Sequence, residues 1–88
     1  MEGNLIYRVQ PIYPALAQAG RVQGVVVLRA VISRAGTIEN LQVLSGHPLL
    51  TNAAIAAVRQ WRYRPYVLNG EPVEVETQVT VNFILGGG

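Results

Sequence analysis

The most regular hydrophobic pattern in the chain lies near its end, in residues 73–85, which read VEVETQVTVNFIL. The odd positions are apolar or threonine, whereas the even positions are polar until Ile84. Strict alternation of this kind is typical of a β-strand with one face on a core and the other in water. Because the segment is more than twice as long as a usual strand, the partners along its two edges become the main question.

Two further β-strands are predicted in the first half of the chain. Residues 22–33 are rich in β-branched side chains and apolar on both faces, which is typical of a central strand. Arg34–Gly36 predicts a short hairpin connection, with glycine where a positive φ is needed. The next strand is predicted over residues 37–44, and the irregular spacing of its apolar residues predicts a β-bulge near Glu39–Asn40.

Two helices are predicted from spacing and from proline positions. Pro14 suits the first turn of a short helix, because the following residues 15–19 are mostly strong helix formers. Residues 49–61 repeat apolar side chains at three- and four-residue spacing, which predicts a longer helix. Since Pro48 suits the first position of that helix, His47 is the predicted N-cap.

The order helix, strand, strand, helix, strand predicts an α+β fold. The hairpin makes its two strands antiparallel neighbours, and the long connection lets the last strand pair with the other side of the first. The two helices then cover one face of a three-stranded antiparallel sheet, and Asn69–Gly70 forms a tight turn before the last strand, which keeps one edge unpaired. We expect residues 10–85 to form this domain, residues 1–9 to be an N-terminal extension or the end of a linker, and residues 86–88 to be a glycine tail.

Composition narrows the class of protein. Half of the 88 residues are hydrophobic, which excludes a disordered chain and fits one small domain. There is no cysteine, so disulfides and thiol chemistry are excluded. Seven arginines and five glutamates give a net charge of only +2. Nucleic-acid binding usually uses a clustered basic face, so we expect no nucleic-acid partner, although a small basic RNA- or DNA-binding domain is kept as an alternative.

The sequence holds no convincing catalytic or metal-binding set. His47 is the only histidine, and a protein metal site typically needs four ligands. Ser45, His47 and Glu39 are the residue types of a catalytic triad, but two of them in one turn do not easily meet in the required chain of hydrogen bonds. We therefore expect a protein that is not an enzyme and that binds no cofactor.

Aromatic and basic residues alternate after the second predicted helix. Such residues could form a stacking platform for single-stranded nucleic acid: Trp61, Tyr63 and Tyr66 with Arg59, Arg62 and Arg64. We favour the alternative that Trp61 and Tyr63 point into the core while the arginines face solvent. Pro65 forces an extended chain at this point, and such a chain packs alternate side chains inward.

Four segments, in order along nearly the whole chain, carry a specific combination of motifs: QPIYPALAQ (10–18), QGVVVLRAVISRAGTIENLQVLSG (23–46), AAIAAVRQWRYRP (53–65) and NGEPVEVETQVTVNFIL (69–85). Together the Tyr-Pro pair, the hairpin that ends in Ser-Gly and the Trp-Arg-Tyr-x-Pro run resemble the C-terminal domain of the TonB family of energy transducers.

The resemblance implies a periplasmic domain of a protein anchored in the inner membrane, with the anchor and a proline-rich linker outside this chain. It implies that an ExbB/ExbD motor, driven by the proton gradient, energises the protein. It also implies that the domain grips the TonB box of an outer-membrane TonB-dependent transporter, so that siderophores, cobalamin or similar ligands enter. The identity of the transporter and its ligand is not contained in these residues.

The same resemblance implies where the partner binds. In the family the TonB box adds to the edge of the last strand by β-augmentation, in which backbone groups supply the affinity. The expected partner-binding residues are Arg8, Gln10, Glu76, Thr77, Gln78, Val79, Thr80, Val81, Asn82 and Phe83. Isolated domains of the family also form strand-exchanged homodimers. A structural or dimerisation module that uses this edge, or a paralogue that serves another cell-envelope partner, is therefore the alternative.

Overall fold

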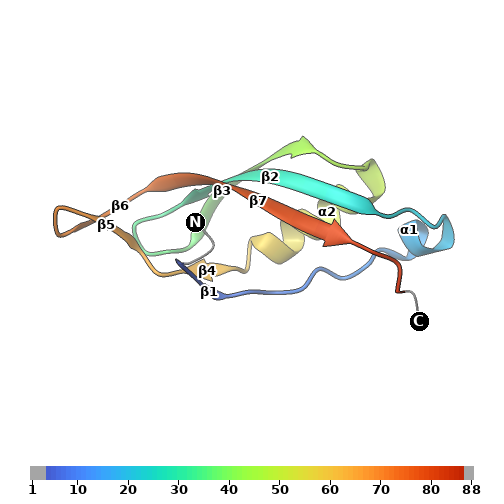
Figure 1. Ribbon diagram of the computed structural model, residues 1–88, viewed down its shortest axis with the longest axis horizontal. Helices are drawn as coiled ribbons and strands as arrows, with labels where there is room; N and C mark the ends of the chain where they lie inside the picture. Colours follow the sequence, from blue (N-terminus) through green and yellow to red (C-terminus); the bar gives the residue numbers. More distant parts are fainter. Residues whose placement is uncertain (1–3, 87–88) are drawn as a thin grey trace.

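The computed structural model describes residues 4–86 and shows an α+β domain of nine short elements (Figure 1). Of the predicted N-terminal extension and glycine tail, residues 1–3 and 87–88 lie outside the described residues. In chain order the elements are β1 (Leu5–Tyr7), α1 (Ala15–Ala19), β2 (Gly24–Ile32), β3 (Ile38–Ser45), α2 (Pro48–Val58), β4 (Arg62–Tyr63), β5 (Tyr66–Leu68), β6 (Glu71–Val73) and β7 (Val75–Phe83).

The main sheet has three antiparallel strands in the order β3-β2-β7, as predicted. The β2–β7 register runs without a break from Gly24 opposite Phe83 to Ile32 opposite Val75. Along β3 the register shifts, because Val31 faces Asn40 while Ile32 faces Ile38. Glu39 is therefore the extra residue of a β-bulge, which confirms the position inferred from the irregular apolar spacing.

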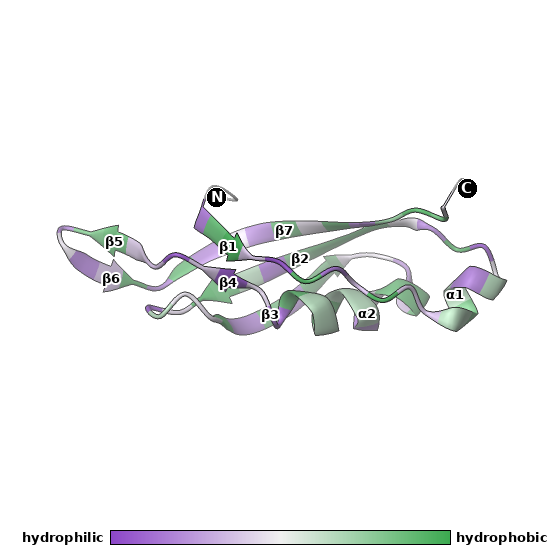
Figure 2. Cartoon of the chain, turned by 90° about the horizontal axis from the view of Figure 1, so that it is seen from below, coloured by the Kyte–Doolittle hydropathy of each residue, from purple (hydrophilic) through white to green (hydrophobic). Residues whose placement is uncertain are grey.

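Both helices lie on the same side of this sheet (Figure 2), and their buried side chains join those of the strands in one core. Each fully buried valine, leucine, isoleucine or phenylalanine in such a core stabilises the fold by about 1.5–3 kcal/mol relative to exposure. The core residues are Ala17, Val26, Leu28, Ala30, Ile32, Leu50, Ala54, Val58, Trp61, Tyr63, Val79, Val81 and Phe83. The predicted inward packing of Trp61 and Tyr63 is thus confirmed.

The predicted cap of the second helix is also present. His47 occupies the N-cap position of α2, and its Nδ1 accepts a hydrogen bond from the backbone N–H of Leu49 at 3.0 Å. Pro48 follows in the first turn, where the missing N–H costs nothing because helix N-termini leave it unpaired.

The last predicted strand is shorter than its alternating sequence suggests. The turn at Asn69–Gly70 joins β5 to β6, and Val73 pairs with Tyr66 in that hairpin rather than with the main sheet. The ladder with β2 then begins at Val75 and ends at Phe83. Alternation alone does not distinguish one long strand from two successive strands with different partners, since both place every second side chain on one face.

Residues 4–14, called the strap below, cross the domain as an extended segment (Figures 1 and 2). Its β1 pairs with β4, and the backbone N–H of Arg64 donates to the carbonyl of Asn4 at 2.7 Å. Further along, the indole N–H of Trp61 donates to the carbonyl of Val9 at 2.9 Å. Hydrogen bonds to β4, Arg64 and Trp61 thus hold the strap from Asn4 to Val9.

Candidate functional site

Within residues 4–86 no strand lies beside the outer edge of β7. In the sheet β7 pairs only with β2, and no backbone hydrogen bond reaches its other edge from anywhere in residues 4–86. Figure 1 shows β7 as an outer strand of the sheet, next to β2. An unpaired edge presents a row of N–H and C=O groups and is a template for another extended chain.

Side chains along β7 alternate as the sequence predicted. Val79, Val81 and Phe83 are each no more than 5% exposed and anchor the strand in the core. The even-numbered residues are exposed to solvent: Glu76, Gln78, Thr80 and Asn82. Thr77 is half-buried at the core side of the strand. The core therefore fixes the strand while its backbone edge stays accessible.

A hydrogen bond at the β2–β3 hairpin shows which backbone N–H and C=O groups of β7 face β2. The N–H of Ser33 donates to the carbonyl of Thr37 at 2.8 Å, so the backbone groups of Ser33 face β3. Because these groups alternate sides along a strand, those of Ile32 face β7. Ile32 lies opposite Val75 in a register without shifts, so Val75 and every second residue after it bond to β2.

A contact at the far end of the strand agrees with this assignment. The N–H of Leu85, which has the same parity as Val75, donates to the side-chain Oε1 of Gln23 at 3.0 Å, on the β2 side. The backbone groups that face outward therefore belong to the even-numbered residues Glu76, Gln78, Thr80 and Asn82. These are the groups that an added strand would bond.

The two predicted site residues outside β7 lie on the strap. The guanidinium carbon of Arg8 is 5.3 Å from the centroid of the Trp61 ring, a cation–π contact that orients the side chain. Gln10 is exposed two residues further on. Neither residue forms a hydrogen bond or ion pair with β7 in the described part of the chain, and the contact of Arg8 is with Trp61.

Tyr13 connects the strap to the edge strand, and the sequence analysis did not include it among the site residues. Its ring meets Phe83 edge-on, with centroids 5.5 Å apart and planes at 88°, and its hydroxyl donates to the carbonyl of Val22. The signal for Tyr13 was present in the Tyr-Pro pair, which the resemblance used as a motif without assigning the side chain a contact.

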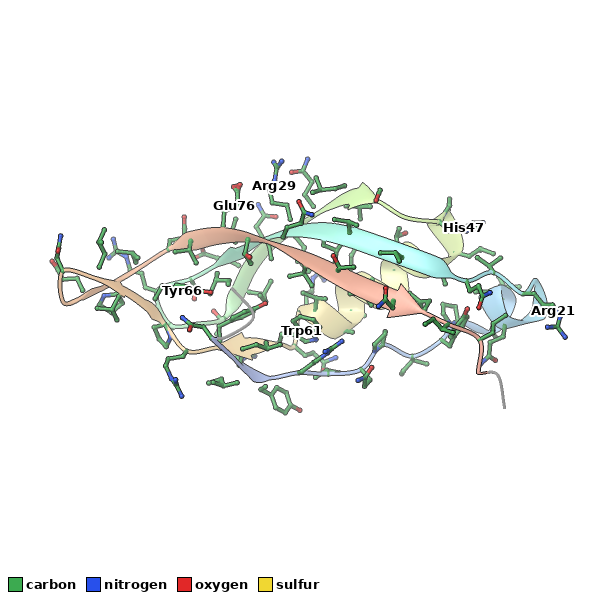
Figure 3. All side chains as sticks on the ribbon, in the orientation of Figure 1. Arg21, Arg29, His47, Trp61, Tyr66 and Glu76 are labelled. Carbon is green, nitrogen blue, oxygen red and sulfur yellow. The ribbon has the colours of Figure 1, made fainter. Side chains whose placement is uncertain are left out.

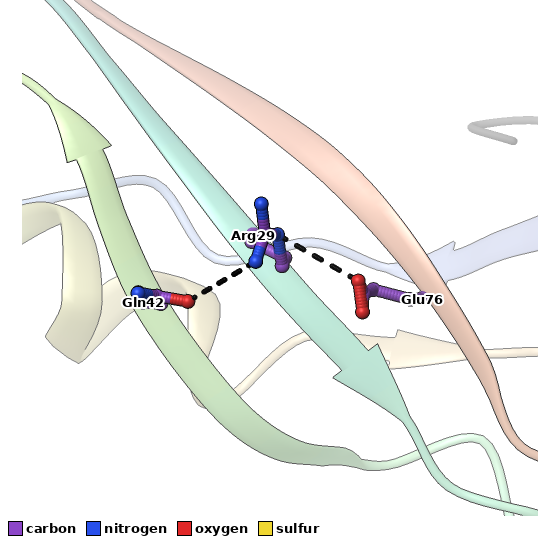
Figure 4. Close-up of polar contacts among 3 residues, drawn as sticks. All are labelled: Arg29, Gln42 and Glu76. Atoms are coloured by element: carbon purple, nitrogen blue, oxygen red, sulfur yellow. Dashed lines mark hydrogen bonds and ion pairs between the residues drawn. The ribbon is translucent and has the colours of Figure 1, made fainter.

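Arg29 is a second residue that the sequence analysis missed. Figure 4 shows it between two neighbours, with its Nε 3.6 Å from Oε2 of Glu76 and its NH1 donating to Oε1 of Gln42 at 3.4 Å. The contacts cross all three strands on the face away from the helices. A hollow of about 210 Å³ opens beside them, lined by Arg29, Glu76, Thr77 and Gln78.

Two carboxyl groups meet just before β7 begins. A hydrogen bond that the protonated carboxyl of Glu39 donates to Glu74, together with repulsion between the two charges, raises the pKa of Glu39 above its ordinary value of 4.5. In residues 4–86 no group of three acidic, histidine or cysteine side chains could hold a metal ion. No helix in the same range is long and apolar enough to span a membrane.

Comparisons with known proteins agree with these features. The sequence profile described as Gram-negative bacterial TonB protein C-terminal matches residues 9–85. Protein TonB of Klebsiella pneumoniae is 42% identical over 84 residues, which are 93% of this chain and 32% of that protein. Protein TonB of Vibrio cholerae is 32% identical over 82 residues, which are 91% of this chain and 34% of that protein. The chain thus spans about a third of the length of these relatives.

A solved structure has the same fold. The solution NMR structure of the Pseudomonas aeruginosa TonB CTD aligns with a TM-score of 0.79 at 27% identity, over 96% of this chain and 87% of that one. The family is one of non-enzymatic energy-transducing proteins. The match to its profile covers most of the chain, and the chain therefore belongs to the family of Gram-negative bacterial TonB C-terminal domains.

Proposed function

We propose that this domain is the periplasmic peptide-binding part of an energy transducer, and that β7 binds the TonB box of an outer-membrane TonB-dependent transporter by adding it as a further strand. The observation that carries the proposal is the unpaired, regular edge of β7 beside a core-anchored ladder with β2. The family supports the class of partner, since its members are TonB proteins.

The geometry supports a grip that uses backbone groups rather than a deep pocket. Four residues, Glu76, Gln78, Thr80 and Asn82, direct their N–H and C=O groups outward, and each bond made there contributes about 0.5–1.5 kcal/mol net. Because these groups belong to every residue type, transporters with different side chains would bind the same edge. The buried side chains of Val79, Val81 and Phe83 hold the edge strand on the core before the partner arrives.

In this proposal the domain transmits force rather than performing chemistry. An inner-membrane ExbB/ExbD motor would act on the anchor of the transducer, and the pull would pass through this domain to the transporter during uptake of siderophores, cobalamin or similar ligands. The strap is the path by which such a pull enters, since it is bound to the core at Trp61 and reaches Phe83 through Tyr13. Arg8 and Gln10 lie on that path.

The same edge supports a second function, a homodimer in which two copies pair or exchange β7 strands. An unpaired strand with nine register positions is long enough to form either interface. A dimer through β7 would leave no edge free for a peptide. The two functions are therefore distinguished by the mass of the domain in solution and by competition for one surface.

The test is an NMR titration of the isotope-labelled domain with TonB-box peptides, after its mass in solution is measured. We expect a monomer whose amide shifts concentrate on residues 75–83, with Arg8 and Gln10 following. Thr80→Pro removes an outward N–H and leaves the β2 ladder intact, so it should weaken binding about tenfold or more. Thr80→Ala keeps the N–H and is the matched control.

Three outcomes would contradict parts of this scheme. A folded monomer that shows no shifts with any box peptide would overturn the peptide grip. A mass of two chains with β7 amides protected before peptide is added would favour the dimer. Equal weakening by Thr80→Pro and Thr80→Ala would show that the side chain, not the backbone edge, binds the partner.

A further inference from the structure

The open edge of β7 is not uniform in charge. Of its four outward-facing residues only Glu76 is charged, while Gln78, Thr80 and Asn82 are neutral. Glu76 lies near the beginning of β7, whereas Arg21 lies beyond its end (Figure 3). An added strand would therefore meet one negative side chain at a defined position, followed by a neutral stretch.

The contacts of Glu76 hold its carboxylate on the outer face beside the edge. Its Oε2 lies 3.6 Å from Nε of Arg29, and the two side chains are 58% and 48% exposed, respectively. Arg29 stands on β2, one strand further from the edge, and its NH1 is already engaged by Gln42 (Figure 4). No other cation pairs with Glu76 among residues 4–86, so its Oε1 is open to an incoming donor.

Space for that donor exists next to the carboxylate. The hollow of about 210 Å³ is lined by Glu76, Thr77 and Gln78 of β7 and by Arg29 of β2, which places it on the outer face of the sheet next to the edge strand. A side chain opposite Glu76 in an added strand would have its Cβ about 4.5–5.5 Å from that of Glu76. Glu74 supplies a second carboxylate just before the strand, and it lies within hydrogen-bond distance of Glu39.

We infer that Glu76 is a specificity-determining residue of the edge, which selects a lysine or arginine side chain in the strand that adds to β7. The cationic group lies in the hollow between Glu76 and Gln78 and bonds the free carboxylate oxygen. Since a strand that slips by one residue turns its other face outward, this contact also favours one register over its neighbours. The inference rests on the proposed function, because it requires a strand on this edge.

The test uses capped synthetic peptides of alternating threonine and valine, long enough to span Glu76 to Phe83. Three versions carry threonine, lysine or glutamate at both ends, so the direction of the added strand does not affect the comparison. Dissociation constants are measured by NMR titration at about 10 mM ionic strength, where screening is weak. We expect the lysine peptide to bind about two- to tenfold more tightly than the glutamate peptide, the range that cross-strand charge pairs give.

Substitutions of Glu76 test whether this residue causes the preference for the lysine peptide. Glu76→Gln should reduce it towards unity, and Glu76→Arg should reverse it. Glu71→Gln is the matched control, because it removes the same charge from β6 at the β5–β6 hairpin, away from the open edge, and should leave the preference unchanged.

The outcomes separate this inference from the function on which it rests. If all peptides bind β7 but the lysine preference is absent or survives in Glu76→Gln, the role of Glu76 is refuted and the grip stands. If no peptide, charged or neutral, shifts the β7 amides, the proposed function fails and the selection by Glu76 fails with it. Amide spectra of each variant without peptide verify that the fold is unchanged.

Discussion

Gly36, in the β2–β3 hairpin, is the position where the backbone leaves least room for a side chain. Its φ is +86°, and a Cβ built there would lie 1.9 Å from the carbonyl oxygen of Tyr63 and 3.0 Å from its carbonyl carbon. The obstructing atoms are backbone, and the N–H of Tyr63 donates to the carbonyl of Gly36 at 2.8 Å. Gly36→Ala must therefore move β4 or the hairpin.

Gly70 provides a control with nearly the same φ but open surroundings. Its φ is +83°, and nothing lies within 4 Å of the position of an added Cβ. Gly70→Ala should cost only the left-handed backbone strain, about 1–2 kcal/mol. Gly36→Ala should cost that strain plus overpacking of about 1–3 kcal/mol, so we expect a total of about 2–5 kcal/mol.

Urea unfolding, followed by the fluorescence of Trp61, the only tryptophan, measures the free energy of unfolding of both variants. Each 1 kcal/mol lost should lower Tm by about 4–8 °C in a domain of this size. Equal losses for the two variants would refute the close approach of Gly36 to Tyr63. If Gly36→Ala does not fold while Gly70→Ala does, the difference has the predicted sign.

Two further predictions concern the paired carboxyls and the strap. Because the pKa of Glu39 is raised, the folded state holds this proton more tightly than the unfolded state, so stability falls as pH rises above 4.5 through the raised pKa. Glu39→Gln should therefore raise Tm near neutral pH and change it little below pH 4.5, and a pH-independent difference in thermal melts would contradict this. Trp61→Phe removes the donor to the Val9 carbonyl, so we expect a loss of about 1–2 kcal/mol in denaturant unfolding. Amide exchange should become faster in residues 5–9 but not in β7, and unchanged exchange would show that the indole bond does not hold the strap.

The sequence predicts the main sheet well because its strands are long and each has a recognisable pattern of apolar residues. The two faces of β2 identify it as central, and the irregular spacing after Thr37 locates the bulge at Glu39. The short elements are different, since β1 and β4 have three and two residues and carry no detectable period. Their pairing joins residues more than fifty positions apart, which local pattern does not reveal.

The sequence likewise predicts some features of the candidate site and not others. Alternation in residues 75–83 predicts which side chains face the core, and burial of Val79 and Val81 confirms it. It does not predict which N–H groups face outward, because that depends on the register with β2 and on the bond between Ser33 and Thr37. The contacts of Arg29 and Tyr13 were equally hidden, since each depends on a partner brought close only by folding.

The strap also has a mechanical consequence. The domain measures 49 × 24 × 15 Å, and both the strap and β7 extend along its long direction (Figure 1). Hydrogen bonds between strands lie perpendicular to the strands, so traction along the long axis shears many of them at once. Traction across that axis instead opens them one after another. The domain should therefore bear a larger load when pulled lengthwise through Asn4 than when pulled sideways. The direction of pull would decide whether the strap separates from the domain before an added strand dissociates from β7.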